Sequence, residues 1–439
     1  MKKKLLLALG CFLLLSGWFI AFLLNSMPQY SNLYILAPTL LLGVGMGLMH
    51  KTVGGKLTAL TLAFTALIAI LTMNQVLPSR SVSLSAFNQR MGDGGQVGHA
   101  IPVITQDSDR SGSFATDRFL ETFADVEVHL FAKLPGSVRM MTFDPAGNLY
   151  VTIPKLGAIY QLRDGDHDGH ADESILYHVG LDDPHGLLWD NGKLYVAETS
   201  QLLELQDTDS DNQVDQVRTV LEGLPDDGGH WTRSLALGKD GFLYLSVGSR
   251  CNACEEEDPM RATVLKVNPE TGNSSVFARG LRNSVGLSFS PDGETLWGSD
   301  NGRDQLGDDI PPDEINQISA GNNYGWPNCY GKQIPDPQLG SSTICQNTVA
   351  SVVDLPAHSA PLGITFGERL NAPEEYRNSL YVAFHGSWNR SVPTGYKLIR
   401  IPYQNHQMST AGKDFLRGWL VGGNAWGRPV APVVGNDGN

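Results

Sequence analysis

Two short acidic segments have the residue types and spacing that bind calcium. Residues 164–172 read DGDHDGHAD, with carboxylates at every second position and a glycine after the third. This matches positions 1, 3, 5, 6 and 9 of a calcium loop. Position 12, a bidentate Glu in an EF-hand, is Ile175, and the flanking residues are typical of strands. We therefore expect a structural calcium turn and no EF-hand, with the ligands Asp164, Asp166, Asp168 and Asp172.

The second acidic segment, DTDSDNQVD at 207–215, begins 43 residues after the first. It also lies between two strand-like runs. Turn chemistry explains part of such a pattern, but closely spaced carboxylates repel one another when no cation is bound. Asn212 stands where a calcium loop prefers glycine, so we expect a weaker site here. Its candidate ligands are Asp207, Asp209, Asp211 and Asp215.

A recurring strand–turn–strand pattern explains the 43-residue offset. Each copy has a short apolar strand, a polar turn and a second apolar or aromatic strand. The leucines after the turns are spaced by 45, 49, 53 and 84 residues. Hairpins at such a period are typical of propeller blades. We predict an all-β, six-bladed propeller over 121–439, with the acidic segments joining the third and fourth strands of blades one and two. The copies lie at 141–151, 187–197, 235–248, 287–300, 364–386 and, incompletely, 430–438.

Two irregularities are expected in this propeller. The 84-residue interval implies an insertion of about thirty residues between blades four and five, near 302–360. The sixth copy stops after its first strand, whereas the N-terminal strand, here 126–132, usually closes the last blade as its outer strand. We therefore expect a C-terminally truncated blade six with exposed edges, which would lower stability and impair activity.

Cationic and imidazole side chains lie just upstream of each repeat. The inner strand of each blade starts near the central axis, so these residues should meet at one mouth. Clustered arginines favour a multiply anionic ligand, because each guanidinium can bind a carboxylate or phosphate through two hydrogen bonds. A His at the same mouth suits a general base. The set comprises Arg139, His185, His230, Arg233, Arg282, Asn283, His358 and Arg428.

An acidic stretch rich in Gly and Pro occupies 300–327, beside this predicted mouth. One interpretation is a solvated acidic loop. The other is a hard-cation element, because carboxylates and free carbonyls suit Ca²⁺. The acidic residues are Asp300, Asp304, Asp308, Asp309, Asp313 and Glu314.

The N-terminal part has a different composition. The chain has 439 residues and a net charge of −14, yet residues 1–75 contain five Lys and no Asp or Glu, so the rest carries about −19. Such an acidic body argues against nucleic-acid binding. Apolar runs near 5–24, 33–49 and 57–73 predict three membrane spans, although a signal peptide or a lipid anchor at Cys11 would explain the first.

The lysines set the expected orientation of these spans. They precede the first span and separate the second from the third, which places the N-terminus in the cytoplasm. We expect an inner-membrane anchor over 1–75, a flexible linker over 76–120 and a propeller on the periplasmic side.

The cysteines agree with an exported domain. Two disulfides among four cysteines are the default outside the cytoplasm, and three pairings are open. The CNAC sequence would also fit a redox pair, but no βαβ pattern surrounds it. The four cysteines are Cys251, Cys254, Cys329 and Cys345.

Four longer motifs resemble a known family. GGHWTRSLALGKDGFLYLSVGS, GLRNSVGLSF, SDNGRD…PDEINQI…NNYGWP and HGSWNRSVPTGYK are similar to the glucose/sorbosone dehydrogenases that use pyrroloquinoline quinone (PQQ). The residues of these motifs are most similar to those of the L-sorbosone dehydrogenase branch. The resemblance runs from about residue 125 to the C-terminus and implies a six-bladed propeller that oxidises a sugar hydroxyl or aldehyde with PQQ and Ca²⁺.

The resemblance also implies residue roles. His230 matches the general base that takes the substrate proton as hydride moves to the quinone. The carbonyls of Gly302 and Arg303 match those that hold the cofactor's Ca²⁺, although Arg303 replaces a proline of the soluble glucose enzymes. Implied cofactor contacts are Arg282, Asn283, Asn301, Arg390 and Arg428. Candidate substrate contacts are His185, Arg233, Tyr324 and Trp326.

The sequence is compatible with an external electron acceptor and with two other functions. The chain has no CxxCH haem motif, so we expect membrane quinone or another external acceptor. A non-catalytic propeller that binds carbohydrate or a protein is one alternative. A calcium-dependent, lactonase-like hydrolase is another. His230 followed by the Arg282–Asn283 pair favours the dehydrogenase.

Overall fold

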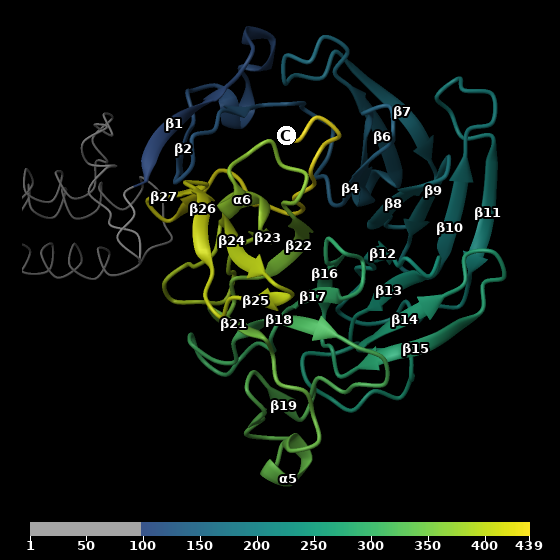
Figure 1. Ribbon diagram of the computed structural model, residues 1–439, viewed down its shortest axis with the longest axis vertical. Helices are drawn as coiled ribbons and strands as arrows, with labels where there is room; N and C mark the ends of the chain where they lie inside the picture. Colours follow the sequence, from purple (N-terminus) through teal and green to yellow (C-terminus); the bar gives the residue numbers. More distant parts are fainter. Residues whose placement is uncertain (1–97) are drawn as a thin grey trace, which may run out of the picture. The chain divides into compact units, whose positions relative to one another are not determined.

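The computed structural model describes residues 98–439 (Figure 1). The predicted membrane spans and residues 76–97 of the predicted linker fall outside the described residues. Within 98–439, no helix is both long and apolar enough to cross a membrane.

Four antiparallel four-stranded sheets follow one another along the chain and form blades one to four. Their innermost strands contact one another in sequence order, and Figure 1 shows the sheets side by side around a common centre. Blade one contains β4 (Met141–Phe143), β5 (Leu149–Ile153), β6 (Ala158–Arg163) and β7 (Glu173–Val179). Blade two contains β8 (Gly186–Asp190), β9 (Lys193–Ala197), β10 (Leu202–Gln206) and β11 (Gln216–Leu221). Blade three contains β12 (Leu235–Leu237), β13 (Leu243–Val247), β14 (Thr263–Val267) and β15 (Ser274–Arg279). Blade four contains β16 (Ser284–Phe289), β17 (Leu296–Asp300), β18 (Asp313–Ile318) and β21 (Val353–Leu355).

The burial of these strands explains why the repeat was visible in the sequence. The second strands, such as β5 and β13, are buried along their whole length and are therefore mostly apolar. The outer strand β15 is mostly exposed and carries polar residues. Polar turns with glycines at positive φ, including Gly147, Gly192 and Gly241, join the first two strands of blades one to three. The predicted propeller-like, all-β fold is confirmed.

A larger, eight-stranded sheet contains blade five. Its blade strands run in the order β22, β23, β24 and β26, and β25 pairs with β24. The sheet then continues through three strands from the start of the described chain, β2, β1 and β3. The bounds are β22 (Pro361–Phe366), β23 (Ser379–Phe384), β24 (Lys397–Gln404), β25 (Gln407–Met408), β26 (Lys413–Arg417), β1 (His99–Ile104), β2 (Phe119–Thr122) and β3 (Val128–His129).

Two predictions about the start of the propeller are corrected by this sheet. Residues 98–120 are not a linker: they form β1, two 3-10 turns and the start of β2, whose backbone pairs with β26. The strand expected at 126–132 is only β3, and it pairs in parallel with β1 rather than completing blade six. Both differences arise because β26 offers a free edge that β2 occupies.

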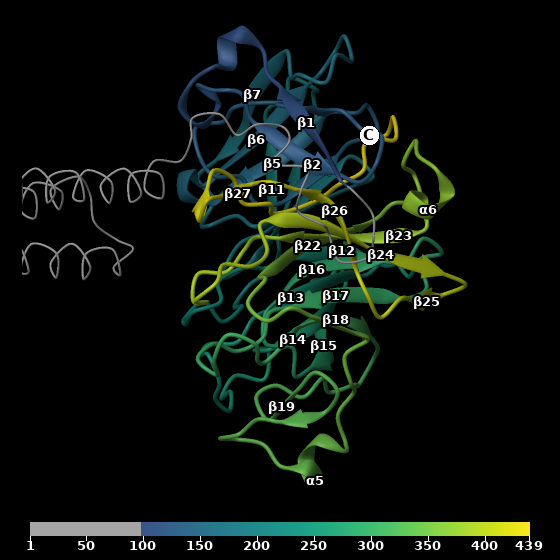
Figure 2. The ribbon, with the colours of Figure 1, turned by 90° about the vertical axis from the view of Figure 1, so that its left-hand side faces the viewer.

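The insertion lies inside blade four rather than between blades four and five. It leaves the sheet after β18 and returns at β21, and it contains β19, β20 and α5. The Cys329–Cys345 disulfide joins β19 to α5. Figures 1 and 2 both show this segment projecting from the blades. Its bounds are β19 (Cys329–Tyr330), β20 (Ile334–Pro335) and α5 (Ser342–Cys345).

No complete sixth blade is formed by residues 98–439, as expected from the interrupted last repeat. The C-terminal residues instead bridge blades five and one. Gly363 donates its N–H to the carbonyl of Val430, and Asn436 donates to the carbonyl of Asp144. Val433 packs against the core of blade one. A cavity of 1990 Å³ lies beside this bridge.

Short elements complete the described chain. Two of the 3-10 turns lie between β1 and β2, and the third precedes β6. α6 precedes β23, and the β27–β28 hairpin follows β26. Their bounds are η2 (Asp107–Asp109), η3 (Gly112–Phe114), η4 (Pro154–Leu156), α6 (Glu374–Arg377), β27 (Leu420–Val421) and β28 (Asn424–Ala425).

Candidate active site

His230 lies in the loop before β12, and its ring is oriented by a residue just after β13. Its Nδ1 is 2.9 Å from the carbonyl oxygen of Ser249 and 2.9 Å from that residue's Oγ. The carbonyl can only accept, so Nδ1 carries the hydrogen and Nε2 keeps its lone pair. Burial, followed by the nearby Arg282, lowers the pKa of His230 to about 3. The ring is therefore neutral near pH 7 and able to accept a proton at Nε2.

A buried carboxylate holds the turn that presents Arg282 and Asn283. The Asp300 carboxylate accepts the backbone N–H groups of Arg282 (3.0 Å) and Asn283 (2.8 Å) and the hydroxyl of Ser284 (2.9 Å). Burial raises the pKa of Asp300 to about 6. This contact fixes the start of β16 against the end of β17, so the Arg–Asn pair is presented by a rigid turn.

The Arg282 guanidinium is almost fully buried, with 4% of the residue exposed. Nε donates to the carbonyl of Asn252 (2.9 Å), and Nη2 donates to the Oδ1 atom of the same residue (2.9 Å). Nη1 donates to the carbonyl of Asn301 (3.2 Å), and the Asp304 carboxylate is 3.3 Å from Nη2. All three nitrogen atoms of the guanidinium therefore have partners within the protein.

The predicted cation-holding carbonyls belong to the loop between β17 and β18. Gly302 donates its N–H to Asp313 (2.9 Å), whose other oxygen accepts from Ala360 (3.0 Å). Burial raises the pKa of Asp313 to about 7. The Arg303 side chain points into the insertion, where it pairs with Asp336 at 2.8 Å. Because its side chain points into the insertion, an arginine at position 303 is compatible with a cation-binding role for its backbone carbonyl.

Asn301 lies beside this loop and fastens it to blade five. Its side-chain nitrogen donates to the carbonyl of Pro361 (2.8 Å), and its backbone N–H donates to the carbonyl of Asn283 (3.2 Å). Asn301 is therefore brought together with Arg282, Asn283 and Gly302.

Three of the four candidate substrate contacts have protein partners instead. His185 is fully buried, and its Nδ1 contacts the Arg233 carbonyl at 2.8 Å. Arg233 is also fully buried and donates to the carbonyls of His230 (3.1 Å) and Pro225 (2.6 Å), so it holds the loop that carries His230. The Tyr324 hydroxyl contacts the backbone of Gln317 and Ser319.

Trp326 is only partly buried and lies at the site. Its Nε1 donates to the carbonyl of Asn252 (3.3 Å). Of the four candidates, Trp326 retains the most accessible side chain beside Arg282.

Arg390 lies between β23 and β24 and contacts the acidic loop between β17 and β18. It pairs with Asp309 at 2.8 Å, and the neighbouring Asn389 donates to Asp304 (2.6 Å). His358 contacts the carbonyl of Gly307 at 2.8 Å. Blade five is therefore joined to the 302–312 loop, whose acidic residues serve as protein contacts rather than as one cluster.

Arg428 lies apart from the Arg282 group, at the cavity beside the C-terminal bridge. It is exposed and donates to the carbonyls of His385 (3.1 Å) and Gly386 (2.6 Å). Burial and the charge of Arg428 together lower the pKa of Arg139. The cavity is lined by both arginines and by Trp231, and His230 and Arg282 are not among its lining residues.

The acidic segments lie where they were predicted, between the third and fourth strands of blades one and two. In the first, carboxylate oxygens of Asp164, Asp166 and Asp172 lie within 4.8 Å of one another. Asp168 is not in this group. Asp207, Asp209 and Asp215 form the equivalent group in the second segment, without Asp211. Strands flank both, so the exclusion of an EF-hand is confirmed.

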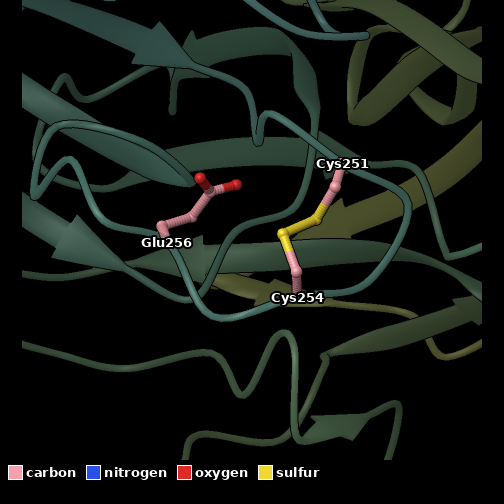
Figure 3. A group of neighbouring side chains, drawn as sticks. All are labelled: Cys251, Cys254 and Glu256. Atoms are coloured by element: carbon pink, nitrogen blue, oxygen red, sulfur yellow. A yellow bond between two sulfur atoms is a disulfide. The ribbon is translucent and has the colours of Figure 1, made fainter.

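The four cysteines of the described residues form two disulfides, as expected, and the structure resolves the pairing. Cys251 pairs with Cys254 and Cys329 pairs with Cys345. Figure 3 shows the first disulfide with Glu256 beside it. Glu256 accepts the backbone N–H of Arg250 (2.6 Å), so the carboxylate closes the same short loop.

Sequence reasoning missed two residues that build this site, Ser249, which orients His230, and Asn252, which contacts Arg282. Asp300 was predicted only as part of an acidic or cation-binding stretch, whereas it holds the Arg–Asn turn. The position of Asn252 between two cysteines is the one available signal, and it indicates only a disulfide or a redox pair.

The electrostatics of the site favour an anion. Arg282, Arg261 and Arg233 all lower the pKa of His230, while the protein as a whole is strongly acidic. Nε of Arg390 is buried and has no hydrogen-bond partner. This free donor and the charge of Arg282 fit a ligand with several carboxylates, as PQQ has.

The fold and this cationic site define a propeller-type protein with a neutral, oriented histidine beside clustered arginines. The family model described as TrAA12-like matches residues 121–415. A protein of Borreliella burgdorferi with no characterised activity is 32% identical, over 72% of this chain and 89% of that relative. A pyrroloquinoline quinone-dependent sugar dehydrogenase of Hypocrea jecorina is 25% identical, over 63% of this chain and 75% of that relative.

A solved structure agrees with this match at the level of the fold. The holo form of the pyranose dehydrogenase PQQ domain from Coprinopsis cinerea has a TM-score of 0.61 at 22% identity, covering 73% of this chain and 92% of that one. The protein belongs to the TrAA12-like family. The predicted resemblance to PQQ-dependent sugar dehydrogenases is thereby confirmed, while the L-sorbosone branch stays a prediction.

Proposed function

We propose that the protein is a PQQ- and calcium-dependent sugar dehydrogenase that oxidises a sugar hydroxyl or an aldehyde of the L-sorbosone type. The observation that carries the proposal is the orientation of His230. Its Nδ1–H is held by the Ser249 carbonyl, so a neutral Nε2 faces away from that contact beside a cluster of arginines. A general base needs this combination of a fixed tautomer and a free lone pair.

The residues of the chain divide the work of binding and proton transfer. Asn283, Asn301 and the arginines Arg282 and Arg390 would hold the anionic cofactor, and the carbonyls of Gly302 and Arg303 would hold its Ca²⁺. Arg428 lies at the neighbouring cavity, so its cofactor contact stays a sequence-based prediction. When bound, PQQ supplies the hydride acceptor and Ca²⁺ polarises the quinone. His230 Nε2 takes the proton of the substrate hydroxyl. Trp326 is the best-placed of the proposed substrate contacts.

The sequence-based calcium and membrane assignments complete the proposal. We assign structural Ca²⁺ to the 164–172 segment and, more weakly, to 207–215, because three carboxylates converge in each.

Residues 1–75 would anchor the protein in the inner membrane, with the propeller in the periplasm and membrane quinone as the acceptor. Membrane fractionation with a periplasmic protease tests the location.

The test is reconstitution of the full-length protein with PQQ and Ca²⁺, followed by dye reduction with a panel of aldoses and aldehydes. The wild type should reduce dye only when both are present. His230→Ala should lower kcat by about 100-fold or more while PQQ still binds, because a base contributes 10²–10⁴ to the rate. His406→Ala, an exposed histidine, is the matched control.

Two outcomes would contradict this proposal. A folded wild-type protein that binds PQQ without turnover on any sugar would favour a binding propeller. Hydrolysis of lactones without an electron acceptor would favour a hydrolase. Equal turnover by wild type and His230→Ala would remove the base assignment alone.

A further inference from the structure

Asn252 lies in the loop after β13 and contacts four groups of the site. Its carbonyl oxygen accepts from Arg282 Nε (2.9 Å) and from Trp326 Nε1 (3.3 Å). Its Oδ1 accepts from Arg282 Nη2 (2.9 Å) and from the backbone N–H of Asp304 (2.7 Å). Its Nδ2 donates to the Asp304 carbonyl (3.1 Å). This one residue therefore connects blade three with the Arg–Asn turn and with the 302–304 loop.

The same loop also reaches the proposed base. Cys251 precedes Asn252, and its carbonyl accepts from Ser249 Oγ (2.8 Å), the hydroxyl that contacts His230 Nδ1. The Cys251–Cys254 disulfide closes the loop on both sides of Asn252. Because only four residues lie in this ring, the disulfide fixes the backbone from which both sets of contacts are made.

Arg282 depends strongly on these contacts. Burial lowers the pKa of Arg282, so a charged guanidinium at this position needs partners for its donors. Two of its donor atoms, Nε and Nη2, bond to Asn252, and only Nη2 has a second partner, Asp304. Without the Asn252 side chain, both the guanidinium and the Asp304 amide lose an acceptor.

We propose that Asn252 is a positioning residue for cofactor binding, and that the Cys251–Cys254 disulfide holds it in place. Asn252 fixes Arg282 and the 302–304 loop relative to each other before the cofactor binds. The inference rests on the proposed function for the identity of that cofactor. The geometry that it describes is present in the protein alone.

The first test measures hydrogen exchange in the full-length protein without cofactor. Asn252→Ala should increase exchange of the Asp304 amide, and Asn252→Asp, which retains an acceptor oxygen, should restore protection. Asn328→Ala is the matched control: the side chain of this asparagine contacts Glu255 and the Leu339 carbonyl, but no site residue. Unchanged exchange in Asn252→Ala would overturn the proposal even if the protein does not bind PQQ.

The second test measures the dissociation constant of PQQ by calorimetry in the presence of Ca²⁺. Asn252→Ala should weaken binding by about 10- to 100-fold, the usual effect of removing a residue that orients a ligand-binding group. Asn252→Asp should recover part of the affinity, and Asn328→Ala should bind like the wild type. Wild-type affinity in Asn252→Ala would overturn the proposal. Failure of the wild type itself to bind PQQ would instead contradict the proposed function.

A third test separates the disulfide from the asparagine. The double variant Cys251→Ser with Cys254→Ser retains Asn252 but frees its backbone, so PQQ affinity and Asp304 protection should both fall. In this double-variant background, Asn252→Ala should then lower PQQ affinity and Asp304 protection by less than it does in the wild type. Full additivity of the two changes would show that the disulfide does not act through Asn252 and would overturn that part of the proposal.

Discussion

Glu314, next to the candidate site, is a buried carboxyl group whose pKa is raised to about 8, first by burial and then by Asp300. Between pH 4.5 and 8 the folded protein retains a proton that the unfolded chain has lost. The contribution to stability is therefore complete at low pH and is lost as the pH rises towards 8. Histidines whose pKa is lowered by folding change the pH dependence of stability only below pH 6.5. Between pH 6.5 and 8, this pH dependence therefore reports on the buried carboxyl groups.

Glu314→Gln should make the free energy of unfolding less dependent on pH in this window. The amide can still accept from Gly331, and Asn316, whose Oδ1 has no partner, can turn to accept from the new nitrogen. We expect the slope between pH 6.5 and 8 to become shallower by about 1 kcal/mol per pH unit. Urea unfolding at several pH values measures it. The exposed Glu368→Gln should leave the slope unchanged, and an unaltered slope in Glu314→Gln would disprove the assignment.

At the residue scale, the sequence predicted groups with a recognisable motif and missed those defined by contacts. His230 and the Arg282–Asn283 pair were found because they lie within characteristic motifs just before repeated strands. Asn252 has no such signal, because its partners Arg282 and Asp304 are 30 and 52 residues away and belong to another blade. Asp300 was assigned to a cation-binding stretch, whereas burial turned it into an acceptor for backbone N–H groups.

Among the elements, the end of β13 is the one that lies close to both the proposed base and a proposed cofactor contact. A Cβ atom at Gly248 would lie 2.6 Å from the Cβ of His230 and 2.9 Å from Oδ1 of Asn283. Gly248→Ala should therefore displace His230, lower kcat and reduce the free energy of unfolding by about 1–3 kcal/mol. Steady-state kinetics and thermal unfolding measure the two effects.

Gly229→Ala is the control for this substitution. Gly229 adjoins His230, but a Cβ there would have one neighbour within 4 Å, the Arg250 carbonyl at 3.7 Å. This variant should fold and turn over like the wild type. Normal kcat in Gly248→Ala would show that the loop before β12 adapts freely, and that the glycine does not determine the position of His230.

Elements with local signals were predictable, and elements defined by distant pairing were not. The hairpins of blades one to four have polar turns between apolar strands, so their sequences are sufficient to identify them. β1 and β2 lack this pattern, and β2 finds its partner β26 almost 300 residues later. The insertion was detected by its length, but its place between β18 and β21 follows from a strand pairing that spacing does not encode.

At the scale of the whole molecule, the two ends of the described chain take the place of a complete sixth blade. β2 extends blade five, and residues 430–439 bridge blades five and one. The repeat predicted an incomplete last blade, but it could not predict this closure, which depends on contacts between the beginning and the end of the chain. Glu121 and Arg417 make the main polar contact at the first of these junctions.

Glu121 accepts two hydrogen bonds from Arg417, at 2.8 Å to Nε and 2.7 Å to Nη2, and its side chain is 8% exposed. The Arg417 guanidinium also lies over the ring of Phe123. Removing one partner of such a pair leaves a charge in a poorly hydrated place. Glu121→Ala should lower the free energy of unfolding by about 2 kcal/mol and speed proteolysis of residues 98–122. Glu294→Ala, which removes an exposed pair with Lys239, is the control and should change neither. Equal stability and cleavage in the two variants would mean that the β2–β26 junction is held by its backbone ladder alone, and closure of the propeller would then depend on the C-terminal bridge.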